Sequence, residues 1–159
     1  MRRLFIALLA ALATMAAMAQ SEGRIYVEDF DIAPDSTATV EVLLTNVEAT
    51  RGVQFKMTLP QGLEIEDMEL TKYSRKMKMS LANNQKANNW MVAVYSMSLT
   101  VFPPDTAKAV MTLTLTAKPG FEGGDIIFNK SMGSNEDYIT KYYDDSATKV
   151  LCREPEGTH

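Results

Sequence analysis

The chain has 159 residues and a formal net charge of −4 at pH 7, with 16 basic against 20 acidic residues. This balance argues against a nucleic-acid or an anionic-membrane partner, because both require a basic surface. Cys152 is the only cysteine, so no internal disulfide can form and stability must come from packing.

The first 19 residues have the composition of a secretory signal peptide. Two arginines are followed by an apolar stretch over residues 4–13 and by an Ala-Met-Ala cleavage signal that ends at Ala19. The apolar stretch is too short for a membrane span, which needs roughly 20 residues. We therefore predict cleavage between Ala19 and Gln20 and no membrane insertion afterwards. The protein is expected to be exported, whether periplasmic, on the cell surface or extracellular.

Residues 20–159 are predicted to form one domain. Their number lies within the usual range for a domain, and no repeat or low-complexity linker divides them. Without the two arginines of the signal peptide, 14 basic and 20 acidic residues remain, a net charge of −6.

The predicted domain is all-β. Apolar and polar residues alternate with period 2 in several segments, as in antiparallel sheets that are covered on one face, and Pro- and Gly-containing turns separate them. We predict one helical turn within residues 70–77. The predicted strands lie near 24–30, 38–46, 52–59, 63–70, 78–83, 89–96, 107–117, 124–129, 138–143 and 147–151.

Four segments, taken in order, resemble a cohesin-like domain. They are VEVLLTN at 40–46, GVQFKMTLPQGL at 52–63, VYSMS at 94–98 followed by Phe102, and AVMTLTL at 109–115. The resemblance implies a jelly-roll β-sandwich of about nine antiparallel strands in two sheets, a fold that cohesins share with several carbohydrate-binding modules. It also implies a binding role, since cellulosomal cohesins hold dockerin modules through one sheet face. The chain departs from a scaffold protein in having a single module, which favours a stand-alone binding protein.

The polar face of the strand near 52–59 is the surface that this resemblance assigns to a partner, with Gln54, Lys56 and Thr58. We predict an exported bacterial module without catalytic activity, which binds carbohydrate or an extracytoplasmic protein where polysaccharide is processed. The alternative is a structural or assembly component of the cell surface that acts through strand pairing.

Aromatic side chains are the candidate sugar-binding residues, because flat exposed rings stack on sugars and dominate interface hot spots. Trp90 begins a strand that is apolar on both faces, so a core position is at least as plausible for it. Tyr138, Tyr142 and Tyr143 cluster in a late predicted strand, and at least one of the adjacent pair should face solvent.

Little in the sequence favours catalysis. The only histidine is the last residue, and the densest carboxylates, Glu64, Glu66 and Asp67, fit a solvated strand face better than a glycosidase pair. No cofactor is predicted. Structural calcium is conceivable at two groups of aspartates, which turn formation explains better. These groups are Asp29, Asp31 and Asp35, and Asp144 and Asp145.

Two surface features complete the prediction. Residues 72–78, KYSRKMK, form a basic loop in an acidic protein, either a solvated loop or an anion contact. Three Asp-Ser or Asp-Thr signals fall at predicted turns and resemble a bacterial O-glycosylation motif. The candidate acceptors are Ser36, Thr106 and Ser146.

Overall fold

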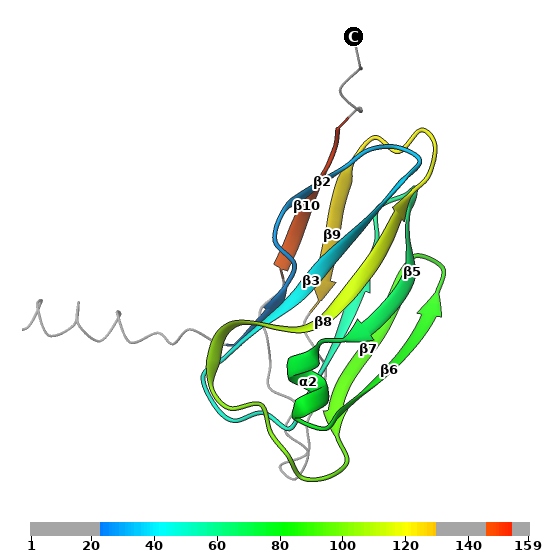
Figure 1. The fold of residues 1–159 in the computed structure, drawn as a ribbon. Helices are drawn as coiled ribbons and strands as arrows, with labels where there is room; N and C mark the ends of the chain where they lie inside the picture. Colours follow the sequence, from blue (N-terminus) through cyan, green and yellow to red (C-terminus); the bar gives the residue numbers. More distant parts are fainter. Residues whose placement is uncertain (1–22, 130–145, 154–159) are drawn as a thin grey trace, which may run out of the picture.

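A computed structural model describes residues 23–129 and 146–153, which form a β-sandwich with one short helix (Figure 1). The predicted signal peptide with its Ala19–Gln20 cleavage site, and the strand predicted at 138–143, lie outside the described residues. The described strands are β1 (Arg24–Tyr26), β2 (Phe30–Ile32), β3 (Ser36–Asn46), β4 (Gly52–Thr58), β5 (Leu63–Leu70), β6 (Met79–Lys86), β7 (Asn89–Ser96), β8 (Asp105–Ala117), β9 (Gly124–Asn129) and β10 (Ser146–Cys152).

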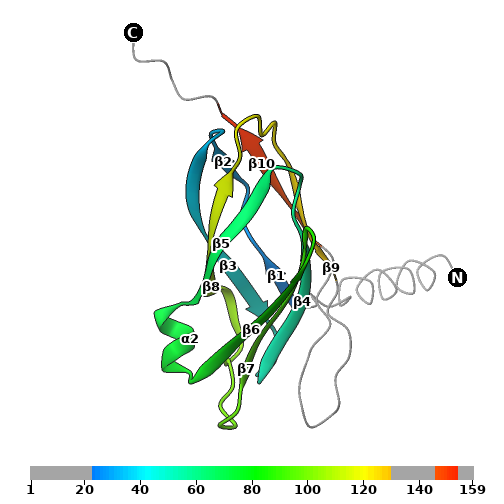
Figure 2. The same ribbon diagram turned by 90° about the vertical axis from the view of Figure 1, so that its right-hand side faces the viewer.

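The strands form two sheets that face each other (Figure 2). One sheet has the order β1-β3-β8-β5, and the other has the order β2-β10-β9-β4-β7-β6. The predicted two-sheet sandwich is thereby confirmed, with ten described strands in place of about nine. One part of the prediction is wrong: β2 pairs with β10 in parallel, so the sandwich is not wholly antiparallel.

The segment 24–30, predicted as one strand, crosses between the sheets. Its first part is β1, which pairs with β3, and the chain then passes to β2 at the edge of the other sheet. Two contacts with β10 hold this crossing. The Thr148 hydroxyl donates to the Val27 carbonyl at 2.6 Å, and the Lys149 amide donates to the Asp29 carboxylate at 2.8 Å.

The core lies between the two sheets and follows the period-2 pattern of the sequence. In β4, Val53, Phe55 and Met57 are buried, whereas Gln54 and Lys56 between them are exposed. Phe55 faces Phe128 of β9, with ring centroids 5.7 Å apart. The predicted alternation in this strand is confirmed.

The predicted helical turn within 70–77 is also confirmed, as α2 (Lys72–Lys76). The Thr71 side chain caps it by accepting a hydrogen bond from the Ser74 amide at 3.2 Å. The hydroxyls of Thr71 and Ser74 donate to the Ala109 and Val110 carbonyls at 2.8 and 2.6 Å. These bonds fix the short helix to β8.

Cys152 is a half-buried free thiol, and its Sγ donates to the Phe121 carbonyl at 2.8 Å. Within residues 23–129 and 146–153, no helix has the length and apolar character needed to cross a membrane.

Candidate partner-binding surface

The predicted partner residues lie together on the outer face of the six-stranded sheet. Gln54 and Lys56 of β4 are exposed there, next to Ala93 and Met91 of β7 in the strand register. The Thr58 hydroxyl donates to the Asn89 side-chain carbonyl at 2.8 Å, which links β4 to the start of β7.

Strand β7 adds apolar residues that the sequence prediction left out. Met91 is 41% exposed and Tyr95 is 37% exposed, and they pair with Asn84 and Ser80 of the edge strand β6. The sequence contained an indication of these residues. Both faces of the strand at 89–96 are apolar and only one face can point into the core, so the other face must expose apolar side chains. We call this surface the partner face; its residues are Gln54, Lys56, Thr58, Ala82, Asn84, Met91, Ala93 and Tyr95.

The partner face has an apolar middle and a polar surround. In the strand register Met91 lies between Lys56 of β4 and Asn84 of β6, and Tyr95 lies between Gly52 and Ser80. Protein interfaces are built in this way, with a partly apolar centre that becomes dry on binding and a polar rim. The exposed side chains can therefore take part in protein association, and none of them forms a catalytic pair.

Trp90 points in the opposite direction, into the sandwich. Its neighbours on the same face, Val92 and Val94, are buried, and its ring packs against the core. Its indole Nε1 is buried and has no hydrogen-bond partner. Trp90 thus shares no surface with Gln54 or Lys56.

Replacing Trp90 by phenylalanine should change the free energy of unfolding by less than about 1 kcal/mol. The substitution removes an unsatisfied buried N–H, which is unfavourable in the native protein, and this gain offsets the lost ring volume. Urea unfolding followed by circular dichroism measures the change. A loss well above that size would mean that the indole N–H has a partner in solution.

The remaining predicted site residues are three tyrosines and three candidate glycosylation sites. Tyr138, Tyr142 and Tyr143 lie outside the described residues, so an aromatic platform there stays a prediction. Of the candidate glycosylation sites, Thr106 is exposed in β8, and the half-buried Ser36 donates to the Ala33 carbonyl at 2.6 Å. A further candidate is Ser146, the first residue of β10.

Carboxylates in the described part of the chain are structural or solvated. Glu64, Glu66 and Asp67 are exposed on β5, and Glu64 forms an ion pair with Lys118. Asp31 forms an ion pair with Arg153 at 3.2 Å. No group of three or more potential metal ligands occurs among the described residues, and Asp144 and Asp145 lie outside them.

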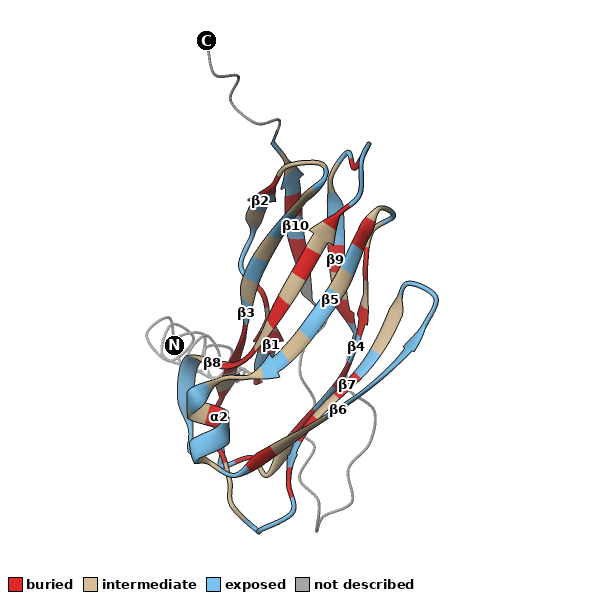
Figure 3. Cartoon of the chain, turned by 45° about the vertical axis from the view of Figure 1, so that its right-hand side comes forward, coloured by how far each residue is buried: buried red, intermediate tan, exposed pale blue. Residues whose placement is uncertain are grey.

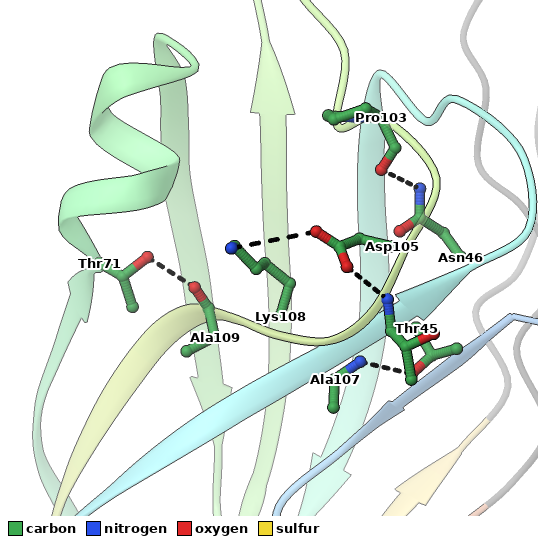
Figure 4. A network of polar contacts seen from close by, with 9 residues as sticks. Thr45, Asn46, Thr71, Pro103, Asp105, Ala107, Lys108 and Ala109 are labelled. Carbon is green, nitrogen blue, oxygen red and sulfur yellow. Dashed lines mark hydrogen bonds and ion pairs between the residues drawn. The ribbon is translucent and has the colours of Figure 1, made fainter.

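Polar contacts hold the end of the sandwich that carries α2 (Figure 4), and an aromatic pair adds to them. The Asn46 amide donates to the Pro103 carbonyl at 3.1 Å, and Asp105 lies 3.9 Å from Lys108. Tyr73 of α2 stacks on Phe102 at 5.7 Å. Burial raises the pKa of Tyr73, and the negative charge of Asp105 raises it further, so this phenol stays neutral at physiological pH.

Comparison with known proteins shows similarity at the level of structure. No protein-family model and no curated protein sequence matches the chain. A cohesin module from a family 33 glycoside hydrolase of Clostridium perfringens superposes with a TM-score of 0.65 at 11% identity, covering 86% of this chain and 100% of that one. A cohesin from Clostridium acetobutylicum gives a TM-score of 0.62 at 11% identity, covering 83% and 91%.

A cohesin–dockerin complex of type I from Clostridium thermocellum gives a TM-score of 0.61 at 12% identity, covering 82% of this chain and 100% of that chain. At such identities the similarity establishes architecture. The two-sheet jelly roll described above is therefore a cohesin-like domain in its fold.

Proposed function

We propose that this chain is an exported, non-catalytic binding module that recognises a protein partner through the partner face. The observation that carries the proposal is the position of Met91 and Tyr95, two large apolar side chains that are exposed on the partner face beside Lys56 and Asn84. Apolar side chains kept at the centre of a flat surface are typical of protein recognition. Several structurally similar cohesins were solved as complexes with dockerins, which supports a protein over a polysaccharide as the partner.

The partner can be captured with a photo-crosslinking residue at position 56. The same residue at position 41 is the matched control, because Glu41 is exposed on the outer face of the other sheet. Proteins exported by the source organism are the natural pool. Crosslinks from position 56 alone would support the proposal, and equal yields from both positions would contradict it.

Binding of the purified captured protein is then measured by calorimetry. We expect a dissociation constant in about the micromolar range or below, weakened about tenfold by Met91→Gln. Leu151→Gln is the control, because Leu151 is similarly exposed (47%) on β10, three strands from β7 in the same sheet. Binding to insoluble polysaccharide that Met91→Gln does not change would favour the carbohydrate alternative.

A role in assembly through strand pairing is supported by one feature, the edge strand β6. Its eight residues carry a single charge, Lys86 at the hairpin end, and most of its side chains are exposed (Figure 3). The other long edge, β5, carries Glu64, Glu66, Asp67 and Glu69, which discourage pairing with another strand. Concentration-dependent self-association that Asn84→Lys abolishes would favour assembly.

A further inference from the structure

Exposed aliphatic side chains and unpaired cations meet at the end of the sandwich that carries α2. Met97 and Leu99, in the loop between β7 and β8, are 81% and 71% exposed, the two largest values among the exposed large hydrophobic residues of the described chain. Figures 1 and 2 both place this loop and α2 at the same end. We call Met97 and Leu99 the apolar tip.

The cations follow each other along α2 and the residues after it. They are all exposed, and none of them forms an ion pair within the part of the chain that the structure describes. We call this group the basic segment; it consists of Lys72, Arg75, Lys76 and Lys78. Among the described carboxylates, Glu69 of β5 lies three residues before Lys72, and Asp105 lies 3.9 Å from Lys108.

Contacts of neighbouring residues hold the loop that carries the apolar tip against the residues of α2 and just after it. The Thr100 hydroxyl donates to the Met77 carbonyl at 2.6 Å, and Tyr73 of α2 stacks on Phe102 of the same β7–β8 loop. Met79 pairs with Ser96, so Lys78, which precedes Met79, and Met97, which follows Ser96, both lie next to the last register pair of β6 and β7. The two groups therefore belong to one surface.

Hydrogen bonds hold the loop in its exposed form. The Ser96 hydroxyl accepts from the Ser98 and Thr100 amides at 3.2 and 3.1 Å and lies 2.6 Å from the Thr100 hydroxyl. Because the Thr100 proton is used on Met77, the Ser96 hydroxyl is the donor between the two. Leu99 has a φ of 63°, a left-handed conformation that glycine or asparagine adopts more easily. A strained position thus holds an apolar side chain that is mostly in solvent.

We propose that this surface docks peripherally on an anionic lipid bilayer, with the apolar tip in the headgroup region and the basic segment on the lipid phosphates. A projecting aliphatic tip needs no complementary pocket, and lysines and arginines beside it are attracted to anionic lipids. A protein hot spot would instead be expected to offer tryptophan or tyrosine in a shaped site. The acidic overall charge argues against a membrane, and the acidic strand β5 ends at Leu70, two residues before the basic segment begins at Lys72. The proposal therefore rests on the four clustered cations, three of α2 and Lys78 after it, not on the charge of the whole chain.

The test is sedimentation of the full mature chain with phosphatidylcholine vesicles that do or do not contain phosphatidylglycerol. Binding is expected only with phosphatidylglycerol and should weaken as salt is raised. Met97→Gln with Leu99→Asn should weaken it about tenfold or more, since both side chains lose their apolar contact. Asparagine tolerates the left-handed conformation, so the fold should survive, which an unchanged unfolding midpoint would verify.

Matched controls separate the two parts of the surface. Lys76→Gln with Lys78→Gln should weaken binding by roughly fivefold for each charge removed, whereas Lys149→Gln on β10 should leave it unchanged. Leu151→Gln is the control for the apolar tip. Equal binding to neutral vesicles, no binding to either kind, or binding to soluble polygalacturonate in place of vesicles would each overturn the proposal. Because the partner face is not altered, these outcomes leave the proposed protein recognition intact.

Discussion

Replacing Phe55 by alanine should lower the free energy of unfolding by about 3–5 kcal/mol. The side chain is 1% exposed, pairs across the sheet with Val92, and faces the Phe128 ring at 5.7 Å. Removing the ring loses its transfer free energy and leaves a cavity, which a sandwich held by two hydrogen-bonded sheets can close only in part. Urea unfolding at equilibrium, monitored by circular dichroism, measures the loss.

The neighbouring residue provides the control. Gln54 precedes Phe55 in the same strand but points to solvent, so Gln54→Ala should change stability by no more than about 0.5 kcal/mol. Together the two variants test the register of β4. If Gln54→Ala were the costly change, β4 would be shifted by one residue, which exchanges all side chains between the two faces.

The strands could be predicted because their side-chain pattern is local. In β4 and β8 the apolar residues alternate with Gln, Lys or Thr, and both strands lie within one residue or two of the predicted bounds. The break between β1 and β2 could not be predicted in this way. It depends on the contact between Val27 and Thr148, residues that are far apart in the sequence.

The candidate surfaces were predictable only in part, because contacts between segments far apart in the sequence decide where some of their residues lie. Gln54 and Lys56 follow from alternation, but Met91 belongs to a strand with two apolar faces, and only packing decides which face is outside. Trp90 lies on the opposite face of the same strand, so the packing that exposes Met91 also turns Trp90 toward the core. The connection between α2 and the β7–β8 loop depends on the bond from Thr100 to Met77, which no sequence spacing predicts.

Replacing Asn46 by alanine should cost about 2–3 kcal/mol, an unusually large effect for a polar residue. Asn46 is 5% exposed, and its side-chain amide donates to the Glu48, Phe102 and Pro103 carbonyls at 2.8, 3.3 and 3.1 Å. The Phe102 carbonyl keeps a second donor, the Thr50 amide at 2.9 Å. The variant therefore loses the side-chain bonds from the end of β3 to the β3–β4 and β7–β8 loops, whereas the backbone bonds between Thr50 and Phe102 remain. Asn84→Ala is the matched control, because Asn84 is exposed on β6.

Hydrogen exchange can show that the effect of Asn46→Ala begins in these loops. Thr50 and Phe102 exchange a pair of backbone hydrogen bonds at 2.9 and 2.8 Å, next to the Asn46 side chain. Their amides should lose more protection in the variant than the amide of Leu113 in the middle of β8, because local opening needs less free energy than global unfolding. An equal loss of protection at all three amides would mean that Asn46 stabilises the sandwich as a whole. Selective loss would place its effect where the apolar tip is anchored, since Phe102 is also the residue on which Tyr73 of α2 stacks.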